Sequence, residues 1–194
     1  VKDVPVLLGI GAHDPRRNLS KLVEKAKDIG MAGVTNEPFI GMYEGDLRNQ
    51  LEAAGLGFDR EVELIRIASE KGLMTLAYVF TPEEAVRMVE AGADFIGAMV
   101  GGVTSGGKAG GAATVSLDDA IDTIRSITEA ISATGRFVPV LVHGGPLNDV
   151  ESVKIVLDAT DAVGYITGST GERLPIEQSV KETIAAFKSL RKEK

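Results

Sequence analysis

The sequence predicts an α/β fold, a TIM-type (β/α) barrel in which six βα units are visible. Apolar runs of strand length alternate with segments of helical periodicity along the chain. These runs are apolar on both faces, which is typical of a parallel sheet covered by helices. The expected strands are Val4–Gly11, Gly33–Asn36, Met74–Phe80, Asp94–Val100, Phe137–His143 and Ala162–Thr167.

Repeated phrases favour the barrel over an open Rossmann-type sheet. Ile29–Val34 and Ala91–Ile96 both read as helix end, glycine, then strand, like two copies of one βα unit. No G-x-G-x-x-G sequence follows the first expected strand. A closed barrel needs eight units. We therefore expect residues 1–194 to form a single barrel domain that is partial, with the first two units missing ahead of Val1. Either these units belong to a longer parent chain, or a six-unit form closes differently or pairs with another copy.

Start signals place the helices between these strands. Thr81–Glu84 combines an N-cap threonine, a first-turn proline and a glutamate at the third helical position. Asp14-Pro15 is expected to open the first helix, which would run to Ile29. Similar starts are expected at Ser116–Asp119 and Asn148–Glu151, and the last helix is expected to begin near Pro175.

Composition excludes several classes of function. The net charge is −7 with no basic stripe, which argues against nucleic-acid binding. There is no cysteine, and no segment has the length and apolarity of a membrane span. We therefore expect a cytoplasmic protein that takes no membrane or nucleic-acid partner. An unclosed parallel edge would expose backbone donors and acceptors, so we also expect a homo-oligomer.

Two glycine-rich turns are the most informative local feature. Val142–Pro146 and Thr167–Gly171 each follow an apolar, β-branched run, and a helix lies between them. Glycine lets the backbone approach an anion, and a helix N-terminus supplies unpaired N–H groups. These turns therefore predict a phosphate or carboxylate site formed by Gly144, Gly145, Gly168, Ser169 and Thr170.

Two longer segments also follow strand ends, where the active sites of such barrels lie. Pro38 to Asp59 contains an extra amphipathic turn around Leu47–Leu51. Gly101 to Thr114 is rich in glycine and is expected to close over a ligand as a lid. Lys108 within it is either a contact to an anionic ligand or a solubilising charge.

The two histidines, His13 and His143, both fall at carboxyl ends of expected strands and would face the same opening, which we call the mouth. Each is either a general acid–base or a structural residue. Asp14 either caps a helix or takes part in catalysis. Together with Glu37 it would offer two carboxylates to Mg²⁺, a cation that prefers oxygen ligands.

Other candidates stand near the last turn and within the third strand. Arg173 can clamp a phosphate or carboxylate with two hydrogen bonds, or it forms surface charges together with Glu172. Tyr78 comes shortly before the end of its strand, where a core position is the simpler interpretation.

Several phrases in register carry a resemblance over nearly the whole chain. They are Pro5–Gly9, His13–Pro15, Gly33–Asn36, Tyr78–Phe80, Ala91–Asp94, His143–Pro146 and Glu172–Pro175. Together they resemble the phosphoenolpyruvate-hydrolase-like family, also described as TIM-barrel signal-transduction proteins. A similar barrel follows Tm-1-like ATP-binding domains, known in plants for inhibiting viral replication.

The resemblance implies a small phosphorylated or carboxylated three-carbon ligand, often with Mg²⁺. It implies site roles for matching residues at strand ends. The sequence differs from the family pattern at His13, at Glu37 and at Ala98–Val100. The matching residues are Asp14, Asn36, Tyr78, His143, Gly144, Gly145, Ser169, Glu172 and Arg173.

Two functions follow as hypotheses. The first is an enzyme of the phosphoenolpyruvate/pyruvate barrel class, a hydrolase or lyase acting on a small phosphorylated or 2-oxo acid. Its catalytic candidates are Asp14, His143, His13 and Glu172. The second is a barrel that senses a ligand, transduces a signal or binds a partner without catalysis. A phosphate-binding barrel of unrelated biosynthetic type is a third possibility, because a fold does not fix a function.

Overall fold

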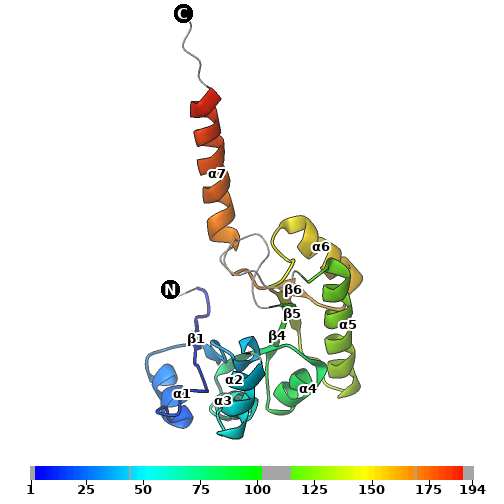
Figure 1. Cartoon of the computed structure of the whole chain (residues 1–194). Helices are drawn as coiled ribbons and strands as arrows, with labels where there is room; N and C mark the ends of the chain where they lie inside the picture. Colours follow the sequence, from blue (N-terminus) through cyan, green and yellow to red (C-terminus); the bar gives the residue numbers. More distant parts are fainter. Residues whose placement is uncertain (1–2, 44, 102–114, 169, 190–194) are drawn as a thin grey trace, which may run out of the picture.

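A computed structural model describes residues 3–43, 45–101, 115–168 and 170–189. Strands and helices alternate along the chain (Figure 1). The strands are β1 (Leu7–Gly9), β2 (Gly33–Thr35), β3 (Met74–Val79), β4 (Phe95–Met99), β5 (Val140–His143) and β6 (Gly164–Tyr165). The helices are α1 (Leu19–Asp28), α2 (Gly45–Ala53), α3 (Phe58–Glu70), α4 (Pro82–Glu90), α5 (Leu117–Ala133), α6 (Val150–Ala159) and α7 (Thr170–Ser189), with a 3₁₀ turn η1 (Ile40–Met42).

The sheet follows the order of the chain. Its six strands lie in the sequence β1-β2-β3-β4-β5-β6 and every neighbouring pair is parallel. The six expected strands are therefore confirmed, although each is shorter than predicted. Over the described residues, β1 and β6 each pair with a single strand, so the sheet is an open arc of a TIM-type barrel. That two further units complete it stays a prediction.

The cap signals for three helices are confirmed. The Thr81 hydroxyl accepts a hydrogen bond from the Glu84 N–H at the start of α4. A capping box opens α5, in which Ser116 and Asp119 bond to each other's backbone N–H. A second capping box, between Asp149 and Ser152, opens α6 at the expected place.

Two helix starts were predicted wrongly. The first helix begins at Leu19 rather than after Asp14-Pro15, because the Asn18 side chain accepts from the Lys21 N–H and caps it. The backbone before it is held in another conformation by Arg60 of α3, which donates to the carbonyl oxygens of Ala12 and Arg17. The last helix begins at Thr170, before Pro175.

The long excursion after β2 contains the predicted extra helix, which is α2, preceded by η1. The glycine-rich segment after β4 is a different case. Residues 102–114 lie outside the described residues, and Lys108 with them, so the expected lid stays a prediction.

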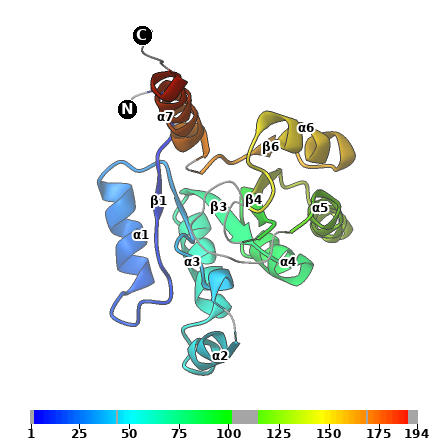
Figure 2. The same cartoon turned by 45° about the horizontal axis from the view of Figure 1, so that its top comes forward.

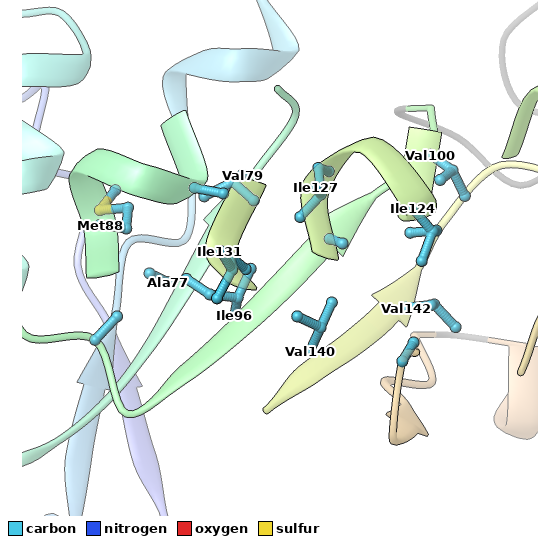
Figure 3. Close-up of a cluster of buried hydrophobic side chains, with 14 of the residues drawn as sticks. Ala77, Val79, Met88, Ile96, Val100, Ile124, Ile127, Ile131, Val140 and Val142 are labelled. Atoms are coloured by element: carbon cyan, nitrogen blue, oxygen red, sulfur yellow. The ribbon is translucent and has the colours of Figure 1, made fainter. Parts of the chain in front are cut away.

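The main core lies between the sheet and the helices that cover it. Figure 2 shows α1, α3, α4, α5 and α6 arranged around one face of the strands. Figure 3 shows side chains of β3, β4 and β5 facing those of α4 and α5. The side chains of Ile96, Ile124 and Ile127 are fully buried there. Replacing such a residue by alanine costs roughly 2–5 kcal/mol.

Helix α7 differs from the others, since it stands away from this layer (Figure 1). Its apolar side chains Ile176, Val180, Ile184 and Phe187 are 51–68% exposed. The expected homo-oligomer stays a prediction. Over the described residues, no helix has both the length and the apolarity that a membrane span requires.

Candidate functional site

Strand alternation sorts the predicted residues onto two faces of the sheet. Ala77 and Val79 of β3 belong to the core beneath the helices, whereas Tyr78 packs with Phe39 and Met99 on the opposite, inner face. In β5, Val140 and Val142 likewise face the helices. The alternation therefore places His143 on the inner face, at the carboxyl end of its strand.

The imidazole of His143 is fixed by one hydrogen bond. Its Nδ1 lies 2.7 Å from the carbonyl oxygen of Ile166, just after β6. A carbonyl oxygen only accepts, so Nδ1 carries the hydrogen and Nε2 of the neutral ring is the basic nitrogen. A Cβ on Gly168 would lie 3.3 Å from Cε1 and 3.9 Å from Nε2. Among the described residues, glycine at position 168 therefore leaves this side of the imidazole without a covering Cβ.

Tyr78 lies beside His143. The two ring centroids are 5.8 Å apart. Burial raises the pKa of the Tyr78 hydroxyl to about 12, and the carboxylate of Glu37 adds to the rise. The hydroxyl is therefore protonated at neutral pH and available as a hydrogen-bond donor. The Tyr78 ring of β3, the His143 ring of β5 and the carboxylate of Glu37, two residues after β2, thus lie near one another at the mouth.

Two residues around Tyr78 were missed by the sequence analysis. A Cβ on Gly97 would lie 2.7 Å from Cδ1 of Tyr78, so glycine in β4 makes room for the ring. Phe39 packs against the same ring, with centroids 5.1 Å apart. A glycine inside an apolar strand was the available signal, because it marks a close approach of another group.

The turn after β5 needs glycine for a reason separate from anion binding. Gly144 and Gly145 have φ angles of 84° and 55°, which favour glycine. A Cβ on Gly144 would lie 2.6 Å from the carbonyl oxygen of Gly101, and one on Gly145 1.8 Å from that of Val100. The turns after β4 and β5 are therefore packed backbone against backbone.

The second predicted turn is described in part. Gly168 lies at His143, and helix α7 begins two residues later, so a helix N-terminus follows the end of β6. Ser169 lies outside the described residues. The side chains of Thr170, Glu172 and Arg173 lie outside them as well. The predicted roles of Ser169, Thr170 and Arg173 at an anion, and of Glu172 in catalysis, stay predictions.

Asn36 is fully buried, and its amide bonds within the protein. Oδ1 accepts from the Tyr78 N–H at 2.7 Å, and Nδ2 donates to the Tyr78 carbonyl oxygen at 3.0 Å. Nδ2 also donates to Glu61 at 2.6 Å. The structure therefore places Asn36 behind the site, against the backbone of Tyr78.

His13 occupies a different part of the mouth from His143. Its ring packs edge-on against Tyr43, with centroids 5.9 Å apart, and its Cε1 faces Gly11. Its Nδ1 is buried and has no hydrogen-bond partner among the described residues. The same holds for the hydroxyl of Thr35, a further buried residue missed from the sequence. None of the described contacts joins the two histidines.

Asp14 is held by its own loop. Its carboxylate accepts hydrogen bonds from Arg16 and Arg17. The bonds from Arg16 are the main cause that lowers the pKa of Asp14 to about 2. Glu37 is exposed, and no group of three metal-ligating side chains occurs among the described residues. The described residues therefore do not fit the predicted Mg²⁺ site.

Comparison with known proteins settles the family. A family model described as phosphoenolpyruvate hydrolase-like matches residues 1–190. The chain belongs to this family. That confirms the resemblance carried by the sequence phrases. It gives the family and leaves the substrate unspecified.

Two curated relatives of this phosphoenolpyruvate hydrolase-like chain come from tomato. The chain is 40% identical over 194 residues to the ToMV resistance protein Tm-1(GCR237) of Solanum lycopersicum, and 39% identical over 191 residues to the ToMV susceptible protein tm-1(GCR26). Each match covers 98% of this chain and 25% of the relative. The chain thus spans about a quarter of the length of these relatives.

A solved structure supports the fold. The crystal structure of a "putative phosphonomutase" from Burkholderia cenocepacia J2315 matches with a TM-score of 0.55 at 12% identity. The match covers 83% of this chain and 67% of the other. At this identity the likeness shows the fold alone, and it agrees with the predicted TIM-type barrel.

Proposed function

We propose that the mouth binds a small phosphorylated or 2-oxo acid and that the chain acts on it as a hydrolase or lyase, with His143 transferring the proton. The observation that carries the proposal is the bond from Nδ1 of His143 to the Ile166 carbonyl oxygen. It leaves Nε2 as the base, at the end of a strand where barrel enzymes hold their catalytic groups.

Tyr78 supplies the second role. Its protonated hydroxyl can donate a hydrogen bond to the substrate oxygen that gains negative charge as a bond within the 2-oxo acid breaks. In a hydrolase, Nε2 of His143 accepts a proton from the attacking water. In a lyase, it accepts a proton from a group of the substrate, and the loss of that proton starts the cleavage of the bond.

Anion binding would come from the turns. Helix α7 starts two residues after Gly168, and helix N-termini favour phosphate and carboxylate groups. In the proposal, Lys108, Ser169, Thr170 and Arg173 contribute here, as the sequence predicts, while Glu172 stays a catalytic candidate. No step runs through Mg²⁺, because Asp14 is already bonded to two arginines.

The test is turnover by the purified chain. Phosphoenolpyruvate, phosphonopyruvate and an acylpyruvate are offered with and without Mg²⁺, and release of phosphate or pyruvate is followed. We expect turnover of one of them. His143→Asn keeps an N–H near the position of Nδ1 but removes the base, so kcat should fall about 10²- to 10⁴-fold while the fold persists. His143→Ala should lose the Ile166 bond as well.

Two outcomes count against the enzyme. Unchanged kcat in His143→Asn would remove His143 from the reaction. Saturable binding of one of these acids with no turnover would leave the alternative, a barrel that senses its ligand without chemistry.

A further inference from the structure

On the buried side of the mouth, the side chain of Asn36 makes the hydrogen bonds to β3 that a neighbouring strand would otherwise make. The backbone of β2 pairs with β3 as far as Thr35 and Leu76. Beyond that point the amide of Asn36 takes over, because it bonds both the N–H and the carbonyl oxygen of Tyr78. Tyr78 is thereby held in place by a side chain that itself needs support.

Glu61 of α3 gives that support. It is 1% exposed, and its two carboxylate oxygens bond to two points of the same segment. Oε2 accepts from Nδ2 of Asn36 at 2.6 Å, and Oε1 accepts from the Ile40 N–H at 2.5 Å. Between these points lie Glu37 and Phe39, both of which act on the Tyr78 side chain.

The charges around Glu61 do not neutralise it. Arg48 of α2 is the nearby cation, but it pairs with Glu84 of α4 and with Glu52. Glu84 is itself buried and adds a like charge. Arg60 on the same helix donates to Ala12 and Arg17. Among the described residues, Glu61 therefore has two neutral N–H donors and no ion pair.

Burial of such a carboxylate favours its neutral form. Desolvation raises the pKa of Glu61 to about 7, against the lowering effect of the bonds from Ile40 and Asn36. If the segment opened, the carboxyl would meet water and regain an ordinary value near 4.3. Protons therefore favour the closed segment, and ionisation favours the open one.

We propose that Glu61 is a proton-controlled positioning residue of the mouth: its neutral form keeps residues 36–43 closed against Tyr78, and its ionised form loosens them. The effect on a ligand rests on the proposed function. The opening itself does not, because it is a property of the protein without substrate.

The test is hydrogen exchange of the Ile40 and Tyr78 amides between pH 6 and pH 8.5, corrected for intrinsic exchange. In the native chain the opening equilibrium should rise about tenfold over this range, from the two pKa values above. In Glu61→Gln, a neutral side chain of the same shape, the rise should disappear. Glu63→Gln is the matched control on the same helix, since the Glu63 side chain is 45% exposed and paired with Arg66.

A tenfold rise that persists in Glu61→Gln would overturn the inference. The pH dependence is compared rather than the absolute rate, because the glutamine amide offers one acceptor oxygen to the two N–H donors of Asn36 and Ile40. If Glu61→Gln does not fold, ¹³C NMR of the native Glu61 carboxyl decides. A midpoint near 7 supports the proposal, and one near 4.3 refutes it. A chain with no turnover but with this exchange pattern would lose the proposed function and keep the inference.

Discussion

Nδ1 of His143 and the carbonyl oxygen of Ile166 lie 2.7 Å apart, and this contact joins the ends of β5 and β6. The register of the two strands makes it possible, because Val142 pairs with Tyr165 and the next residues along each chain come into reach. A backbone carbonyl thus sets the tautomer of the catalytic candidate. The protein needs no carboxylate beside the imidazole to do so.

Gly168→Ala tests whether the uncovered side of His143 matters. The new Cβ would lie 3.3 Å from Cε1 and 3.9 Å from Nε2, where a substrate would approach the base. Gly168 does not have a positive φ, so the free energy of unfolding should change by less than about 1 kcal/mol. We expect kcat/KM to fall about tenfold, measured with the substrate found in the turnover screen. An unchanged kcat/KM would place the substrate elsewhere.

Tyr78→Phe and Tyr165→Phe remove the same hydroxyl from opposite faces of the sheet. Tyr165 faces the helices, and its hydroxyl donates to the Leu147 carbonyl oxygen at 3.0 Å. Its loss should cost about 1 kcal/mol of unfolding free energy and leave kcat unchanged. Tyr78→Phe should lower kcat about 100-fold with little loss of stability. Equal effects on kcat would show that Tyr78 has no special role.

Gly145→Ala and Gly55→Ala separate backbone strain from crowding. Both glycines have positive φ, 55° and 70°, so alanine is strained at each by about 1 kcal/mol or more. A Cβ on Gly55 meets nothing within 4 Å, whereas one on Gly145 would lie 1.8 Å from the Val100 carbonyl oxygen. We expect Gly145→Ala to cost about 3 kcal/mol or more in urea unfolding. A cost equal to that of Gly55→Ala would contradict the close packing of the two turns.

The sequence predicts the sheet well because strand and capping signals are local. The capping box of Ser116 and Asp119 lies within one helical turn and forms as expected. The start of α1 is different. Where this helix begins depends on Arg60 of α3, which holds the loop of residues 12–17 and lies more than forty residues further along the chain. Reading along the chain cannot supply such a contact.

The site shows the same division. The sequence identifies His143 from its place at a strand end, but its tautomer depends on Ile166, the residue after another strand. Asn36 is found as well, although its partners place it behind the mouth rather than in it. Glu61 could have been found from the sequence as well, because it is a charged residue on an apolar helix face. It lies on the same face of α3 as Phe58, Ile65 and Ala68, where a charged residue needs a reason.

The pH dependence of stability gives a global test of Glu61. Its pKa is raised in the folded chain, to about 7, so its stabilising contribution is complete below the ordinary value near 4.3. That contribution is lost as the pH rises through 7. The loss is on the order of 4 kcal/mol at most, from 1.36 kcal/mol per pKa unit. Carboxylates with lowered pKa values, such as Asp14 and Glu24, act in the opposite direction at lower pH.

Comparing two chains removes that background. The free energy of urea unfolding is measured for the native chain and for Glu61→Gln at pH 5, 6, 7 and 8. The difference should shift in favour of the variant as the pH rises from 5 to 7 and level off above pH 7, because the variant never carries the buried charge. Asp14, Glu24 and the other carboxylates are the same in both chains and cancel. A difference that stays constant from pH 5 to pH 8 would mean that Glu61 titrates alike in the folded and unfolded chain, and that burial does not favour its protonated form.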